Sequence, residues 1–255
     1  DVAGRREPLH EQAGLEVGTV ELAEVEAGGE RLVSALLNCP QRLIVVDAVT
    51  TAHLESVAQA LAHLGDGWVP CGSAGLAEAL AGVWGLRSDV ALPGPGASAA
   101  PVLLVCGSRN EVTRRQLHRA VEADALALVE IDPYRLYDEQ REATRLANAC
   151  RAALESGQSV APTATFAPLV AGGTELVARA LAGAVALLGK GIRPGGMFLT
   201  GGDIAVATCR ALGVLALRII AEVQPGIPAG QLQGGVWDGL WVVTKAGGFG
   251  DAEAL

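Results

Sequence analysis

Short apolar runs alternate with longer amphipathic segments along most of the chain. Runs of strand length, which predict buried strands, occupy residues 43–46, 68–71, 102–106, 125–131, 159–163, 195–200, 215–223 and 240–243. Segments with helical periodicity lie between them, at residues 51–64, 74–84, 112–123, 138–156, 173–188 and 203–212. Strands that alternate with helices predict an α/β fold with layered, mainly parallel sheets, flanking helices and two lobes. Residues 1–30 carry a weak pattern, and we expect an irregular lead-in there.

One segment has the composition of a linker. Residues 87–100 hold two prolines, two glycines and two serines in an otherwise regular alternation of elements. A chain of 255 residues is long enough for two domains. We therefore place a domain boundary here and predict one domain in residues 1–100 and a second in residues 101–255.

The composition narrows the classes of function. Hydrophobic residues make up 50% of the chain but aromatic residues only 4%, so the core must consist mainly of Ala, Val and Leu. The net charge of −9 argues against a general nucleic-acid binder. No apolar run is long enough to cross a membrane, and the cytoplasm is the expected compartment. The cysteines and histidines are scattered, so no metal site is expected, and Cys71 and Cys106 are predicted to be small buried residues.

Three loops share one design, in which glycine and small polar residues follow directly after a predicted strand. They are Gly107-Ser108-Arg109, Gly201-Gly202-Asp203, and the loop from Lys245 to Gly250. Ligands bind at the carboxyl edge of parallel sheets, where glycines and helix N-termini offer free N–H groups to phosphate. The chain contains only two lysines among 19 basic residues, and we place the ammonium of Lys245 at the mouth of the third loop. The alternative for each loop is an ordinary turn.

Several roles within these loops stay open. Ser108 is a hydroxyl donor to a phosphate or adenosine group, or else a displaced helix cap, and Thr113 is the predicted N-cap of the helix that follows. Asp203 either caps its helix or holds a magnesium ion through water. The chain lacks both G-x-x-x-x-G-K-[ST] and a G-x-G-x-x-G that follows a strand, which argues against a Walker-type site and a dinucleotide fold.

Taken together, the motifs resemble the four-carbon acid sugar kinase family, whose members phosphorylate threonate, erythronate or 3-oxo-tetronate with ATP. The resemblance extends from about residue 30 to the end. It rests on the run 43–46 with Asp47-Ala48, and on the segments 69–77, 106–109 with Thr113 and Gln116, 199–203, 211–213, 225–228 and 244–250.

The resemblance implies that residues 101–255 form the nucleotide-binding domain and that residues 1–100 are the incomplete C-terminal part of the sugar-acid domain. The implied cofactors are ATP and Mg²⁺, and the implied nucleotide contacts are Ser108, Gly201, Gly202, Asp203, Ile204 and Gly247. Lys245 is a candidate phosphate stabiliser. The implied partner is a small-molecule sugar acid; neither nucleic acid nor membrane is expected, and a homodimer is left open.

Two departures from the family pattern shape the expected function. The family's N-terminal Asp-Asp-x-Thr-Gly-Ala type motif, which is expected to supply the catalytic Asp, has no counterpart in this sequence. Position 204 is Ile where the family generally has a small or hydroxyl residue. The leading hypothesis is an ATP-dependent sugar-acid kinase that binds ATP–Mg here, although this chain alone is not expected to phosphorylate threonate. The alternative is a degenerate nucleotide-binding module without kinase activity.

Overall fold

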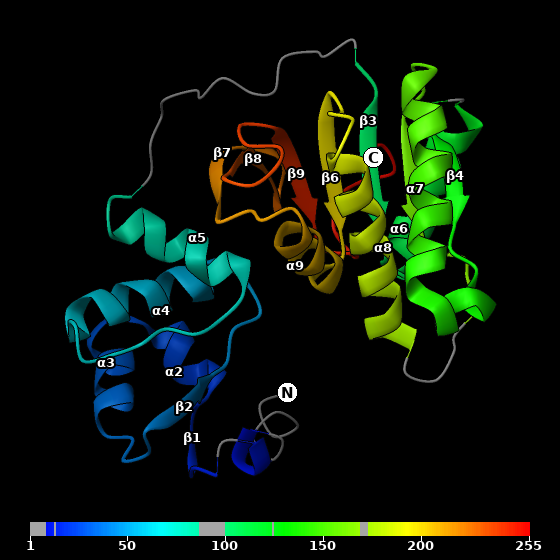
Figure 1. Cartoon of the computed structure of the whole chain (residues 1–255). Coiled ribbons are helices and arrows are strands. Elements are labelled where there is room, and N and C mark those ends of the chain that lie inside the picture. Colours follow the sequence, from blue (N-terminus) through cyan, green and yellow to red (C-terminus); the bar gives the residue numbers. More distant parts are fainter. Residues whose placement is uncertain (1–8, 13, 87–99, 124, 169–172) are drawn as a thin grey trace. The chain divides into compact units, whose positions relative to one another are not determined.

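The chain forms two compact units in a computed structural model, one of Asp1–Val90 and one of Ala91–Leu255 (Figure 1). The structure describes residues 9–12, 14–86, 100–123, 125–168 and 173–255. Apart from Ala100, the predicted linker 87–100 lies outside the described residues. No helix in these described ranges is long and apolar enough to cross a membrane.

In its described residues, the first unit combines a pair of parallel strands with four labelled helices and a helical stretch at residues 9–12. Strand β1 (Val17–Val20) pairs with β2 (Leu43–Val46), so that Val17 lies opposite Leu43. The helices are α2 (Leu22–Ala27), α3 (Gly29–Leu37), α4 (Thr51–Leu64) and α5 (Ala74–Val83). Their apolar faces enclose a small core of Val20, Val25, Leu32, Leu36, Val57 and Ala60. The hydroxyls of Thr50 and Ser73 cap α4 and α5, which explains why those helices begin where they do.

Three predictions for this unit were wrong. The lead-in contains β1 and α2, whose short elements are stabilised by packing on β2 and α4 rather than by a long periodic pattern. Residues 68–71 form no strand: Val69 is 91% exposed and Cys71 is exposed as well, against the prediction of a buried thiol. An apolar run becomes a strand only beside a partner, and Pro70 also lacks the N–H that a ladder needs.

The second unit is built on a mixed sheet. Its strand order in the described residues is β4-β5-β3-β6-β9-β8-β7. The pairs from β4 to β9 are parallel, whereas β8 pairs antiparallel with both β9 and β7. The strands are β3 (Val102–Cys106), β4 (Ala127–Glu130), β5 (Val160–Thr163), β6 (Gly196–Thr200), β7 (Ala216–Gln224), β8 (Ile227–Gln233) and β9 (Trp241–Lys245). The predicted α/β class with mainly parallel sheets is confirmed; β8 was not predicted.

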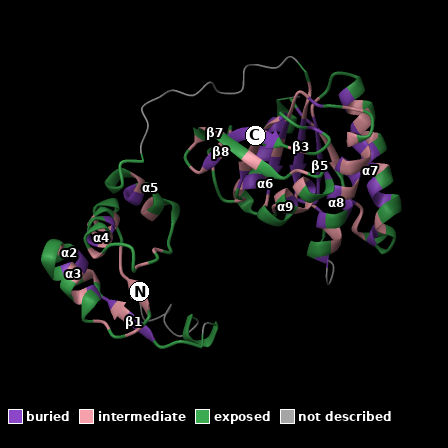
Figure 2. Cartoon of the chain, turned by 60° about the vertical axis from the view of Figure 1, so that its left-hand side comes forward, coloured by how far each residue is buried: buried purple, intermediate pink, exposed green. Residues whose placement is uncertain are grey.

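Helices cover both faces of this sheet. Leu103 and Val105 face a core that also receives side chains from α7 (Glu139–Glu155), α8 (Gly173–Gly189) and α9 (Gly202–Ala211). The intervening Leu104 and Cys106 face α6 (Glu111–Glu122) on the opposite side. Because alternate strand residues point to opposite faces, both faces of β3 are buried. Figure 2 shows this as buried strands between helices whose outer faces are exposed.

Candidate functional site

The three glycine loops meet at the carboxyl ends of neighbouring strands. In the register of the sheet, Cys106 of β3 lies beside Thr200 of β6, which lies beside Lys245 of β9. The N–H of Gly107 donates to the Thr200 carbonyl at 3.2 Å, and the N–H of Gly201 donates to the Lys245 carbonyl at 3.1 Å. These bonds carry the ladder one residue beyond each strand, so the loops separate from the sheet at the same level.

Glycine is required at two positions because the loops approach each other closely. A Cβ on Gly107 would lie 2.3 Å from Cγ1 of Ile204, and a Cβ on Gly247 would lie 2.1 Å from Oγ of Ser108. A Cβ on Gly201 would lie 3.5 Å from the backbone N of Ser108. Ser108 therefore contacts both other loops, and residues that are about 140 positions apart in the sequence form one surface.

A cavity of about 240 Å³ opens at this junction. Five of the six predicted nucleotide contacts line it, namely Ser108, Gly201, Gly202, Asp203 and Ile204. Gly247 is not part of the lining but packs directly against the Ser108 side chain. Gly107 and Arg109 of the first predicted loop also line it. The rest of the wall consists of residues that sequence reasoning did not identify: Pro133, Ala164, Ala167, Pro168, Gly173, Thr174 and Val177.

The N-terminus of α9 supplies N–H donors that have no partner among the described residues, and Gly202 and Asp203 line the cavity. Gly201 is the N-cap and offers no side-chain acceptor, so the first N–H groups of the helix lack the partners that a capping side chain would give. Asp203 lies inside the first turn and is exposed, so the prediction that it caps the helix was wrong. Its carboxylate instead lines the cavity beside these N–H groups.

The start of α6 positions Ser108. Asn110 is the N-cap, and its side chain accepts a hydrogen bond from the N–H of Val112 at 2.9 Å. The N–H of Asn110 in turn donates to Oγ of Ser108 at 3.3 Å. The prediction that Thr113 is the cap was wrong: it is fully buried, and its hydroxyl donates to the Gly247 carbonyl at 2.7 Å. Thr113 thus ties α6 to the third loop.

Lys245 does not lie at the mouth of its loop, as the sequence analysis had placed it. Its residue surface is 3% exposed, and its ammonium donates to the hydroxyl of Thr113 at 3.2 Å. The same nitrogen donates to the carbonyls of Ala246, Gly247 and Phe249 at 3.2–3.3 Å. The reason is that residues 246–249 fold back over the side chain. Burial lowers the pKa of the Lys245 ammonium.

Gln116 completes this buried polar group under the loop. Its amide nitrogen donates to the carbonyls of Phe249 and Asp251, at 3.2 and 2.6 Å. Thr113 and Gln116 are three residues apart, so they occupy one face of α6. Two polar residues on the otherwise apolar face of a helix were the sequence signal for this contact.

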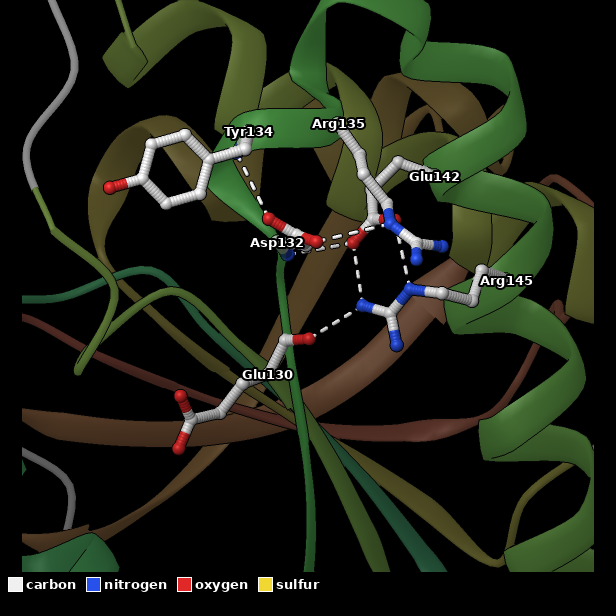
Figure 3. Close-up of polar contacts among 6 residues, drawn as sticks. All are labelled: Glu130, Asp132, Tyr134, Arg135, Glu142 and Arg145. Atoms are coloured by element: carbon white, nitrogen blue, oxygen red, sulfur yellow. Dashed lines mark hydrogen bonds and ion pairs between the residues drawn. The ribbon is translucent and has the colours of Figure 1, made fainter.

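A second polar cluster, drawn in Figure 3, holds the 3₁₀ helix η1 (Pro133–Asp138). Pro133 of this helix forms part of the cavity wall. The fully buried carboxylate of Glu142 accepts from the N–H of Asp132 at 2.8 Å and from two nitrogens of Arg145 at 2.6 and 2.9 Å. Arg145 also donates to the Glu130 carbonyl. Burial on its own would raise the pKa of Glu142, but these hydrogen bonds and the Arg145 charge outweigh it and lower that pKa.

Ionisable side chains are otherwise sparse around the cavity. Arg109 lines it, and its guanidinium donates to the carbonyls of Ala164 and Ala167. Cys106 is buried beneath the first loop against the Thr165 hydroxyl, as the sequence predicted, and burial raises the pKa of its thiol. Within the ranges that the structure describes, no three metal-ligating side chains come together. The glycine loops and the start of α9 at the cavity suit an anion held by backbone N–H groups.

Two family models match the chain. Residues 103–255 match the family model described as a nucleotide-binding C-terminal domain, and residues 6–80 match a sugar-binding N-terminal domain. D-threonate kinase of Salmonella typhimurium is 34% identical over 262 residues, which cover 96% of this chain and 60% of that protein. D-threonate kinase of Bordetella bronchiseptica is 35% identical over 217 residues, or 84% of this chain and 51% of that protein.

A solved structure shares the fold. A domain of unknown function from Bordetella bronchiseptica, crystallised with citrate as a domain-swapped dimer, is 31% identical with a TM-score of 0.55. The match covers 96% of this chain and 58% of that one. The chain thus spans between 51% and 60% of the length of the proteins named above. With both domain models and the named kinases matching along it, the chain belongs to the four-carbon acid sugar kinase family.

Proposed function

We propose that this chain carries the ATP site of a kinase that phosphorylates a four-carbon sugar acid. One observation carries the proposal: Ser108 lies in contact with Gly201 and Gly247, so that three loops from neighbouring parallel strands surround one cavity. The family supports phosphoryl transfer, and the loops suit the phosphates of a nucleotide because their glycines permit close backbone approach.

The described residues divide the work of binding. The N–H groups at the start of α9, at Gly202 and Asp203, face the phosphates, and the Ser108 hydroxyl adds a neutral donor beside them. The apolar wall at Ala164, Ala167 and Val177 suits the base. Bound ATP supplies the phosphoryl group that is transferred. Catalysis in such a site consists mainly of positioning and charge stabilisation.

Magnesium fits the site through Asp203. Mg²⁺ is usually held by one or two carboxylates together with substrate phosphates and water, rather than by a cage of protein ligands. The Asp203 carboxylate is exposed at the cavity and adjoins the helix N-terminus, where phosphates are favoured. Asp203 is therefore the residue that we assign to the metal ion that accompanies the nucleotide.

The acceptor is a small sugar acid of the threonate, erythronate or 3-oxo-tetronate type. This assignment rests on the family and on the match of residues 6–80 to the sugar-binding domain. We propose that the unit Asp1–Val90 contributes to that acceptor site. A homodimer is a further proposal, prompted by the domain-swapped dimer of the related structure.

Calorimetric titration of the 255-residue chain with ATP–Mg and with ADP tests the nucleotide site. We expect saturable binding of both, weakened by Ser108→Ala and, for ATP–Mg only, by Asp203→Asn. Ser156→Ala is the matched control, because the hydroxyl of this exposed serine donates to the carbonyl of Ala153 in its own helix. Flat titrations with both nucleotides would overturn the proposal.

The second candidate is a nucleotide-binding module without kinase activity. Ile204 favours it, because this side chain is buried over Gly107 and presents hydrocarbon to the cavity at a position next to the helix N-terminus. The two candidates differ in turnover. A coupled ADP-release assay with threonate, erythronate and 3-oxo-tetronate, run with wild type and Ile204→Thr, tests the kinase directly, because turnover in either protein would exclude the module. Absence of turnover fits both candidates, since the motif expected to supply the catalytic Asp has no counterpart in this sequence. An Asp-Asp-x-Thr-Gly stretch encoded in frame immediately upstream would then favour the kinase.

A further inference from the structure

Lys245 is a buried cation whose partners are neutral oxygens. Its ammonium has three N–H bonds and lies within 3.2–3.3 Å of four oxygens, three of which are backbone carbonyls of its own loop. Among the ion pairs of the described residues, none joins Lys245 to a carboxylate. Burial of a charge without a counter-ion costs free energy of folding. The stability of the fold therefore does not explain why a lysine lies at position 245.

We propose that Lys245 is a positioning residue for the polyphosphate of the nucleotide: its ammonium holds the carbonyls of the loop inward so that the N–H groups of Gly247 and Gly248 face the anion. This inference rests on the proposed ATP site and assigns how its third loop is shaped. Lys245 itself does not touch the ligand, in contrast to the phosphate contact that its sequence context predicted.

The hydrogen bonds of the loop show this division between carbonyls and N–H groups. The Gly247 carbonyl accepts from Lys245 and from the Thr113 hydroxyl, and the Phe249 carbonyl accepts from Lys245 and Gln116. The N–H groups of Gly247 and Gly248 have no partner among the described residues. Because buried donors occupy the carbonyls, the N–H groups remain available to an anion, as in an anion-binding nest.

The charge of Lys245 points to the same kind of ligand. The ammonium lies beneath a loop of half-exposed and exposed residues, so its field reaches the outer side of Gly247 and Gly248 through little protein. An anion bound there would supply the missing counter-charge for the Lys245 ammonium, although the loop separates the anion from the ammonium. Bound polyphosphate would accordingly raise the lowered pKa of Lys245 towards its ordinary value.

The test combines three variants with two measurements. Lys245→Met removes the ammonium. Thr113→Val removes a fully buried hydroxyl that lies 2.7 Å from the Gly247 carbonyl and 3.3 Å from Oγ of Ser108, so the amide spectra of Gly247 and Gly248 report on the loop separately from Ser108. Thr208→Val is the matched control, because Thr208 is also fully buried but its hydroxyl has no hydrogen-bond partner among the described residues. The measurements are amide NMR spectra of the ligand-free chain and calorimetric affinities for ATP–Mg and for inorganic tripolyphosphate.

We expect Lys245→Met and Thr113→Val to shift the amide resonances of Gly247 and Gly248 before any ligand is added. Each should also weaken tripolyphosphate binding by about tenfold or more, equivalent to about 1.4 kcal/mol. Thr208→Val should do neither. If Lys245→Met does not fold, Thr113→Val carries the test, because it leaves every charge in place.

Different results refute different parts. Unchanged Gly247 and Gly248 resonances in both variants would overturn the positioning role without affecting the proposed function. A loss of affinity in Lys245→Met alone, with Thr113→Val binding like wild type, would mean that the ammonium touches the ligand. This result would also overturn the positioning role. Failure of the wild-type chain to bind ATP–Mg or tripolyphosphate would overturn the proposed function and the anion assignment together, while the spectra would still decide whether Lys245 shapes the loop.

Discussion

Gly247→Ala should damage the nucleotide site more than it damages the fold. The added Cβ would lie 2.1 Å from Oγ of Ser108 and 3.1 Å from Cβ of Asn110. Carbon and oxygen atoms that are not bonded do not approach this closely, so either the Ser108 side chain rotates away or the third loop moves by about 1 Å. Both responses pull apart the two groups that we assign to phosphate.

The magnitude follows from the kind of adjustment that is available. Overpacking of a well-filled contact costs about 1–3 kcal/mol. Ser108 is half-buried and can rotate, so we expect the lower half of this range, which corresponds to roughly a tenfold loss of ATP–Mg affinity. The unfolding midpoint should fall by only a few degrees, since the contact lies at the edge of the sheet.

Gly248→Ala, in the same loop and likewise assigned to the anion, is compared with this substitution, because any loss beyond that of Gly248→Ala comes from the contact with Ser108. Its Cβ would meet only Nδ2 of Asn110 at 3.5 Å, an ordinary contact, while the same backbone stiffening is introduced. Calorimetry and thermal unfolding of both variants compare them directly. Equal losses of affinity in the two would show that loop stiffness matters and not contact with Ser108; wild-type affinity for Gly247→Ala would refute the proximity argument outright.

Three further outcomes are expected. Asn110→Ala removes the cap of α6 and should lower the free energy of unfolding by about 0.5–2 kcal/mol in chemical denaturation. Serine also caps helices, so an equal loss in Asn110→Ser would contradict the cap role. Glu142→Gln should cost about 2 kcal/mol at neutral pH through the weakened Arg145 bonds. The pKa of Glu142 is lower in the folded chain than its ordinary value of 4.5, so the ionised carboxylate stabilises the fold fully above pH 4.5 and loses this effect as the pH falls below 4.5. The free energy of unfolding of Glu142→Gln, measured by denaturation at each pH, should lack this loss. Parallel pH curves for wild type and Glu142→Gln would contradict the role of Glu142. Gly107→Ala should be disruptive because its Cβ meets Ile204, and Ile204→Ala should restore thermal stability when the two are combined; no rescue would argue against that contact.

Much of the site could be predicted because its parts are local. The strands that end at Cys106, Thr200 and Lys245 follow from apolar runs bounded by glycine, and parallel strands necessarily bring their carboxyl ends to one edge. That reasoning placed Ser108 and the Gly201 turn together, and the structure has them lining one cavity. Helix caps were less predictable, because Asn110 and Thr113 are both acceptable cap residues and the choice depends on what else each side chain contacts.

The sequence by itself determined the α/β alternation, the buried parallel strands and the glycine loops, because hydrophobic periodicity and backbone freedom are properties of neighbouring residues. Only the tertiary structure decided where the charged end of a long side chain such as Lys245 lies and which segments form the wall of the cavity. Lys245 lies under its loop because Thr113 and the carbonyls of residues 246–249 surround its nitrogen, a contact that spans 132 positions in the case of Thr113. The walls at Pro133 and Ala164–Pro168 likewise come from other elements, and no local pattern records which elements will meet.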